Sequence, residues 1–185
     1  MSSTSGSDSE DQNKFSRCKP ESIDKLCRTT RFNKEELQII YRGFKQQCPT
    51  GVLREETLRS ILANFFPQGD SSEYAHYVFL TLDTERIGSI SFEKFILTLS
   101  ILSRGSVEEK LRWVFSLYDV DCDGYLSKDD LFAVSEAIYH LMGKWTSPHI
   151  HQDTIEDHVD YALSVRISSS AFFFLKSFQH FQLFI

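Results

Sequence analysis

The sequence lacks several features that would assign it to common functional classes. No apolar run of about 18 residues occurs, so we expect no membrane-spanning helix. The four cysteines are scattered without a CxxC pair, which argues against a zinc ribbon or a disulfide scaffold and favours a reducing compartment. Lys and Arg number 20 against 26 Asp and Glu, a net charge of −6 without a basic block. Direct binding to nucleic acid is therefore not expected.

Targeting and catalytic signals are also scarce. Residues 1–4 lack the apolar core of a signal peptide, and position 2 is not glycine, so we expect neither secretion nor N-myristoylation. We predict a cytoplasmic protein that reaches membranes through a partner or through acylation of Cys18 or Cys27, although ordinary free thiols are the simpler interpretation of both. The chain has no P-loop, GxGxxG or nucleophile elbow, so we do not predict an enzyme.

What the sequence does contain is a series of helical stripes. Apolar residues recur at the spacing of one helical face in six segments from about residue 22 onward, and the first two follow i, i+3, i+4 and i+7. The six stripes contain, in chain order, Leu37, Ile40, Tyr41 and Phe44; Leu58, Ile61, Leu62 and Phe65; Tyr74, Val78, Phe79 and Leu82; Phe92, Phe95, Ile96, Leu99 and Leu102; Val107, Leu111, Val114, Phe115 and Tyr118; Leu131, Val134, Ile138 and Leu141. They predict three helix–loop–helix pairs.

The loops inside these pairs repeat. Gly51, Gly88 and Gly124 are 37 and 36 residues apart, which indicates a duplicated supersecondary unit. An aliphatic residue stands two positions after each glycine: Leu53, Ile90 and Leu126. We expect the first two loops to pair through a short strand that contains Leu53 and Ile90. A helical bundle with incidental loop glycines is the alternative.

The third loop, residues 119–130 (DVDCDGYLSKDD), fits the twelve-residue calcium loop of an EF-hand. Oxygen ligands stand at alternate positions, as a hard divalent cation requires, and glycine stands at the sharp turn. The predicted ligands are Asp119, Asp121, Asp123, Tyr125 through its carbonyl, Ser127 directly or through water, and Asp130. A solvated Asx-rich turn is the alternative.

Position 12 of this loop is Asp130 instead of the usual glutamate. Because its side chain is one methylene shorter, it would not readily chelate with both oxygens. We therefore predict that Ca²⁺ binds more weakly than in a standard loop and that Mg²⁺ competes for the same site.

The other two loops lack the full ligand set, although the second keeps carboxylates at positions 1 and 3. In residues 83–94, Ile87 stands at position 5 and Lys94 at position 12, while residues 46–57 carry no carboxylate at positions 1, 3, 5 or 12. We predict that both act as structural hinges. A transition-metal site formed by His149, His151 and His158 is a weaker hypothesis, because such a spacing is common by chance in polar connectors.

Four segments together resemble the Kv-channel-interacting proteins of the neuronal calcium sensor group, over about residues 18–159. They are RFNKEELQIIYRGFKQQCPTGV, FFPQGDSSEYAHYVF, LSILSRGSVEEKLRWVFSLYDVDCDGYLSKDD and AIYHLMGKWTSP. The resemblance implies an all-α fold with four EF-hands in two lobes, the first hand inactive and metal at the third and fourth. It also implies binding to the cytoplasmic N-terminus of A-type (Shal-like) potassium channels. One relative is described as a calcium-regulated transcriptional repressor.

The C-terminus departs from this pattern. A fourth loop should begin near Ile167, yet no acidic residue follows Asp160, and phenylalanine is abundant. We infer an alternatively spliced or truncated form whose third hand has lost its partner and leaves an apolar face open. The tail places Phe174, Phe178, Phe181 and Ile185 on one helical stripe. Docking onto the third hand, membrane insertion and a disordered tail all remain open.

These observations predict an all-α EF-hand protein with an intact N-terminal lobe and an incomplete C-terminal lobe. The predicted segments are a disordered tail (1–21), a degenerate N-terminal EF-hand pair (22–104), a metal-binding third hand (105–145), a connector with the start of a lost fourth hand (146–165) and a divergent tail (166–185). The connector itself is expected over about residues 143–157. The predicted function is a calcium-binding regulatory subunit of an A-type potassium channel, peripheral at the plasma membrane, with oligomerisation left open. The alternatives are a calcium-regulated transcriptional repressor and a channel-binding isoform with an impaired calcium response.

Overall fold

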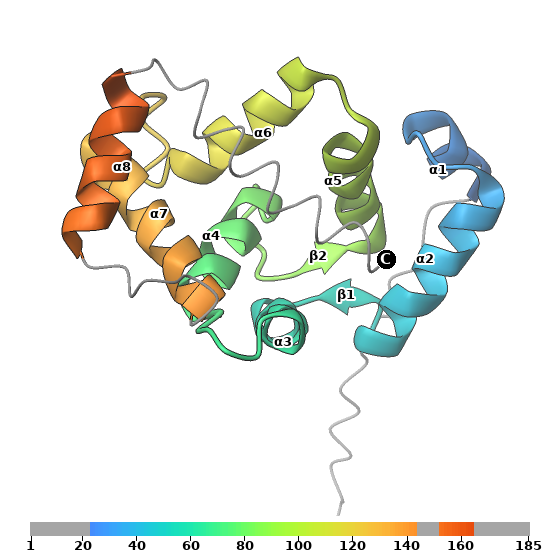
Figure 1. Cartoon of the computed structure of the whole chain (residues 1–185). Helices are drawn as coiled ribbons and strands as arrows, with labels where there is room; N and C mark the ends of the chain where they lie inside the picture. Colours follow the sequence, from blue (N-terminus) through green and yellow to red (C-terminus); the bar gives the residue numbers. More distant parts are fainter. Residues whose placement is uncertain (1–22, 144–151, 165–185) are drawn as a thin grey trace, which may run out of the picture.

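The computed structural model describes residues 23–143 and 152–164, which form an all-α EF-hand fold with one short sheet (Figure 1). The described helices are α1 (Ile23–Thr29), α2 (Lys34–Gln47), α3 (Glu55–Phe65), α4 (Ser72–Leu82), α5 (Phe92–Arg104), α6 (Val107–Tyr118), α7 (Lys128–Met142) and α8 (Gln152–Ser164). The strands are β1 (Val52–Leu53) and β2 (Ile90–Ser91). All six predicted helical stripes are confirmed, as α2 to α7. No described helix combines the length and apolarity needed to cross a membrane.

Side-chain caps fix where several helices begin. Asn33 accepts a hydrogen bond from the Glu36 N–H, and the Glu36 carboxylate accepts one from the Asn33 N–H, which forms a capping box at α2. Ser106 forms the same box at α6. These caps satisfy N–H groups that have no partner within the helix, so the local sequence determines the boundary.

The first two loops pair as predicted. β1 and β2 are antiparallel, with Val52 opposite Ser91 and Leu53 opposite Ile90. Leu53 and Ile90 are almost fully buried. Gly51 and Gly88 precede the strands with φ of 86° and 75°, a conformation that residues with a side chain rarely adopt. The glycine–aliphatic repeat therefore reports a real structural duplication.

Aromatic residues join the first two hands. The ring of Phe92 in α5 lies edge-on to Tyr41 and Phe44 of α2, with centroids 4.9 and 5.1 Å apart. Phe44 also contacts Phe95, at 5.4 Å. The entering helix of the first hand thus packs on the exiting helix of the second, and the two hands share one core.

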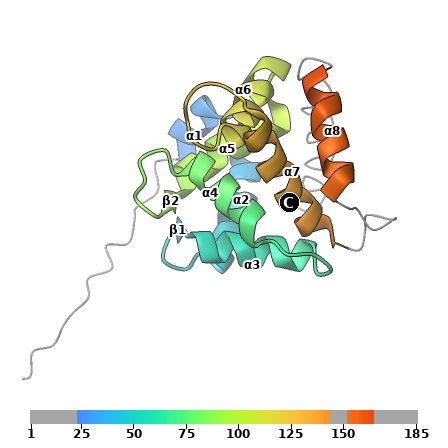
Figure 2. The same cartoon turned by 90° about the vertical axis from the view of Figure 1, so that its left-hand side faces the viewer.

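The third hand is covered by α8, which Figures 1 and 2 show alongside α7. Ile155 and Val159 of α8 are buried, as are Val134 and Ala137 of α7. The expectation that α7 would present an open apolar face is therefore wrong for this part of the helix. Helix α8 begins at Gln152, earlier than the expected end of the connector near residue 157. Burial of two aliphatic side chains explains why helix forms there.

Several predictions fall outside the described residues. They concern the N-terminal tail with Cys18, the paired histidines His149 and His151, and the tail from residue 165 with its phenylalanine stripe. They remain predictions.

Candidate metal centre and apolar groove

The loop between α6 and α7 brings three of the predicted metal ligands together. Carboxylate oxygens of Asp119, Asp121 and Asp123 lie within 4.8 Å of one another. Asp119 caps the end of α6, where its N–H donates to the Phe115 carbonyl over 2.9 Å. Asp121 and Asp123 are exposed to solvent. Alternate positions of the loop thus point their oxygens to one side, as the spacing predicted.

Backbone N–H groups hold this loop in a closed curve. Asp119 accepts hydrogen bonds from the N–H groups of Asp123 and Gly124, at 3.0 and 3.2 Å. Asp123 in turn accepts one from the Tyr125 N–H at 2.7 Å. Gly124 has a φ of 85° with open space around its α-carbon, so its conformation and not its size requires glycine.

The remaining predicted ligands are Tyr125, Ser127 and Asp130, of which Asp130, the one carboxylate, lies outside this group. Asp130 is buried, and its Oδ2 accepts hydrogen bonds from the N–H and the hydroxyl of Ser127, at 2.9 and 2.6 Å. The Ser127 hydroxyl also accepts from the Asp130 N–H, so the two residues form the capping box of α7. The Tyr125 side chain is exposed, which leaves its predicted contribution to the backbone carbonyl. Asp130 is thus engaged with Ser127 and not grouped with the other three carboxylates.

The donor set fits a hard divalent cation. Three carboxylates lie close enough to share one ion, and Ca²⁺ and Mg²⁺ both prefer oxygen ligands. The nearby thiol of Cys122 donates to the Asp119 carbonyl over 3.7 Å. The oxygen atoms that converge here suit a hard cation better than a soft transition metal.

The second loop contains a cation of its own. Asp83 accepts hydrogen bonds from the N–H groups of Ile87 and Gly88, at 3.0 and 2.6 Å, the same curve that Asp119 makes in the third loop. The ammonium group of Lys94 lies 2.7 Å from a Glu85 carboxylate oxygen. Position 12 therefore forms an ion pair with position 3 where a metal-binding loop has a closing carboxylate.

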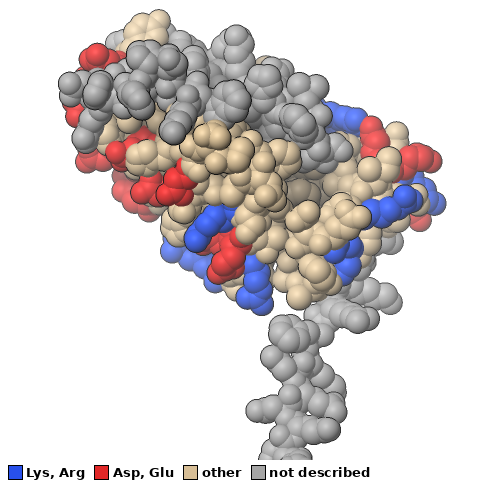
Figure 3. Space-filling view, turned by 60° about the horizontal axis from the view of Figure 1, so that its bottom comes forward, with Lys and Arg blue, Asp and Glu red and all other residues tan. Residues whose placement is uncertain are grey.

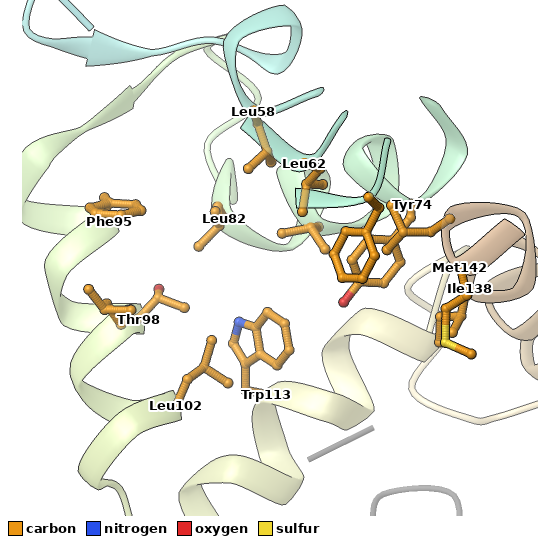
Figure 4. Close-up of a pocket in the computed structure, with 14 residues that line it drawn as sticks. Leu58, Leu62, Tyr74, Leu82, Phe95, Thr98, Leu102, Trp113, Ile138 and Met142 are labelled. Carbon is orange, nitrogen blue, oxygen red and sulfur yellow. The ribbon is translucent and has the colours of Figure 1, made fainter. Parts of the chain in front are cut away.

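An apolar groove lies between the first two hands and the third hand. Its cavity volume is about 90 Å³. It is lined by Leu58, Leu62, Phe66, Tyr74, Val78, Leu82, Phe95, Thr98, Leu99, Leu102, Trp113, Ile138, Leu141 and Met142. Figure 4 shows the indole of Trp113 facing Phe95, Thr98 and Leu102 of α5 on one side and residues of α3 and α4 on the other.

Figure 3 brings the lower side of Figure 1 forward and shows uncharged residues over much of the middle of the described surface, with Lys, Arg, Asp and Glu gathered at its lower left and along its right edge. Among the groove residues only Thr98 and Tyr74 carry hydroxyl groups. The groove is therefore suited to apolar side chains.

The sequence motifs did not identify the groove. Its residues come from five helices, α3 to α7, and from Phe66 just after α3, and most of them belong to ordinary helical stripes. Only their three-dimensional packing shows that part of each stripe faces a cavity. Of the three histidines in the predicted transition-metal site, the structure describes only His158, whose ring contacts the Tyr139 hydroxyl.

Comparison with known families agrees with this geometry. Residues 86–138 match the model of an EF-hand domain pair. The match begins within the second loop and includes the whole third loop. It supports an EF-hand domain pair, a calcium-binding fold, over these residues.

Proposed function

We propose that this protein is a calcium-responsive binding module that regulates an A-type (Shal-like) voltage-gated potassium channel. It would act in the cytoplasm at the plasma membrane, held there by the channel. The observation that supports this proposal is the apolar groove bounded by the N-terminal lobe and the third hand. An amphipathic helix from the channel N-terminus would insert its apolar side chains there.

The lining explains why an amphipathic helix is the proposed ligand. Leu58, Leu62, Phe95 and Leu102 supply apolar walls from two different helices, and Trp113 stands between them. Such a groove recognises apolar residues spaced at i, i+3, i+4 and i+7 on a helix. A small hydrophilic ligand would find few hydrogen-bond partners in it.

The metal site would regulate the groove. Asp119, Asp121 and Asp123 would hold Ca²⁺ or Mg²⁺, with the Tyr125 carbonyl, Ser127 and Asp130 completing the shell. α7 begins at the end of this loop and supplies Ile138, Leu141 and Met142 to the groove. A change at its first turn would therefore move one groove wall.

The groove can be tested on the full chain with a peptide of a Shal-type channel N-terminus. Calorimetry in calcium and in chelator would give the dissociation constant. Thr98→Lys places an ammonium group at the groove, and we expect it to weaken binding about tenfold or more, on the order of 1.4 kcal/mol. Leu97→Lys is the matched control, because Leu97 is the adjacent, exposed residue of α5 and does not line the groove.

Two outcomes would contradict the proposal. The first is absence of peptide binding to the wild-type chain in both calcium and chelator. The second is an equal loss of affinity in Thr98→Lys and Leu97→Lys, which would place the peptide elsewhere.

A further inference from the structure

The C-terminal end of α7 is held by the connection between α3 and α4. We define the clasp as residues 68–70 of this connection together with residues 140–143 of α7 and its cap. The Asp70 N–H donates to the His140 carbonyl over 2.8 Å. This carbonyl lies in the last turn of α7, where carbonyls have no partner within the helix. The N-terminal lobe thus caps the exit helix of the third hand.

Two glycines bring the backbones into direct contact. A Cβ atom on Gly69 would lie 1.8 Å from the Leu141 carbonyl oxygen, and one on Gly143 would lie 2.1 Å from the Gln68 carbonyl oxygen. Gly143 also has a φ of 53°. Since backbone atoms cannot yield as flexible side chains do, the clasp depends on glycine at both positions.

A side-chain contact adds to the clasp. Nδ1 of His140 lies 3.2 Å from a carboxylate oxygen of Glu73, at the start of α4. The Asp70 carboxylate is engaged locally, accepting from the Ser72 N–H over 2.8 Å. The connection is therefore anchored to α4 on one side while its N–H group holds α7 on the other.

The opposite end of α7 carries Asp130. The helix has 15 residues and spans roughly 22 Å. The Asp130 carboxylate is bound to Ser127, so it must leave this partner to join the other three carboxylates. Because aspartate is one methylene shorter than glutamate, the first turn of α7 has to approach the loop more closely. The clasp holds the far end of the same helix against this movement.

We propose that the clasp holds α7 in the position in which Asp130 is bonded to Ser127 and lies apart from the other three carboxylates, and that it thereby lowers the affinity of loop 119–130 for divalent cations and couples this loop to the groove. Leu141 belongs both to the clasp and to the groove wall, and Met142 stands beside it. Release of the clasp therefore shifts the wall. The inference rests on the proposed function only in taking residues 119–130 as the metal site.

The first test is Gly69→Ala in the full chain, with calcium affinity measured by calorimetry. Breaking the clasp removes the interactions that oppose the movement of α7 on metal binding. We therefore expect calcium to bind at least about fivefold more tightly. Gly43→Ala is the matched control, because Gly43 lies in α2 with no atom within 4 Å of its added Cβ. Its affinity should stay within about twofold of wild type. Unchanged or weaker calcium binding in Gly69→Ala would overturn the proposal.

A double variant tests the direction of the effect. In Asp130→Glu the longer side chain reaches the loop with less movement of α7, so the clasp should oppose metal binding less. Adding Gly69→Ala to Asp130→Glu should change calcium affinity by less than about twofold, a non-additive result. An undiminished effect in the double variant would indicate general loosening and would contradict the coupling.

A third measurement needs no variant. Hydrogen exchange of the Asp70 amide in the wild-type chain should be about tenfold faster with calcium than with chelator, because its partner carbonyl moves away. Equal or slower exchange with calcium would overturn the proposal even if Gly69→Ala failed to fold. Channel-peptide binding plays no part in these measurements, so failure of the proposed groove ligand and failure of the clasp can be distinguished.

Discussion

At the scale of single residues, Asp130 determines how strongly the third loop can bind calcium. Asp130→Glu adds one methylene and allows both carboxylate oxygens to approach the ion. In chelator the capping box should survive, because glutamate is the usual residue at this position of the motif. We expect calcium affinity to rise about tenfold, on the order of 1.4 kcal/mol, with a smaller change for magnesium. Calorimetric titration with each ion gives the comparison.

Asp129→Glu provides the control for this change. Asp129 is the adjacent acid, exposed and outside the predicted ligand set, so its extension should leave both affinities nearly unchanged. If Asp130→Glu gained no calcium affinity, the predicted role of position 12 would be wrong.

Residue identity predicted some local contacts and missed others. The spacing of Asp119, Asp121 and Asp123 was enough to predict that they converge, because the loop curve is local and its glycine is in place. The ion pair between Lys94 and Glu85 was not predicted. A lysine at position 12 shows that a ligand is missing, but its flexible side chain finds its partner only in the folded loop.

At the scale of elements, Ser127 links the metal loop to the start of α7. Ser127→Ala removes a side chain that both accepts from the Asp130 N–H and donates to its carboxylate. We expect the free energy of unfolding in chelator to fall by about 1 kcal/mol, the usual cost of losing an N-cap. Urea denaturation followed by circular dichroism measures it.

Ser116→Ala separates capping from the simple loss of a hydroxyl. Ser116 lies within α6, is exposed and donates only to the Arg112 carbonyl of its own helix. Its replacement should change the unfolding free energy by less than about 0.5 kcal/mol. Equal effects of the two substitutions would show that the capping box contributes nothing to stability.

Element boundaries were predictable where caps and periodicity agree. The stripes of α2 to α7 and the pairing of Leu53 with Ile90 follow from spacing alone. The start of α8 could not be predicted in this way, since Ile155 and Val159 are the two buried aliphatic residues among those of α8 whose burial is described. These two residues stabilise α8 by packing against α7, and this tertiary contact cannot be deduced from the local sequence pattern.

At the scale of the whole molecule, the parts that matter for binding arise from contacts between distant segments. The groove takes residues from five helices, and the clasp joins residues 68–70 to residues 140–143. The sequence shows Gly69 and Gly143, but glycine occurs in turns for several reasons. Their presence alone therefore does not predict a close backbone contact. The close approach that requires them exists only after α7 has packed against the N-terminal lobe.

Two ion pairs also connect distant segments and should make stability depend on pH. Arg104 at the end of α5 binds the Glu36 carboxylate with its two terminal guanidinium nitrogens, and Arg31 binds Glu109 over 2.8 Å. These hydrogen bonds lower the pKa of Glu36 and of Glu109 below the ordinary value of 4.5. A carboxylate with a lowered pKa stabilises the folded state above its unfolded pKa, and this contribution is lost as the pH falls through the folded pKa.

The unfolding free energy should therefore decrease as the pH is lowered from about 5 to about 3. Arg104→Gln removes the largest cause of the lowered Glu36 pKa, so its pH dependence should be shallower than that of wild type. Arg112→Gln is the control, because Arg112 pairs only with Glu108 of the same helix, and both side chains are largely exposed. Urea denaturation at each pH gives the slope.

Arg104 also contacts the Phe32 ring and the Arg31 carbonyl, so stability at neutral pH should fall as well. Only the ion pair with Glu36 changes the slope of the unfolding free energy against pH, because the other two contacts do not titrate. Parallel pH profiles for wild type and Arg104→Gln would show that the Glu36 pair contributes no pH-dependent stability.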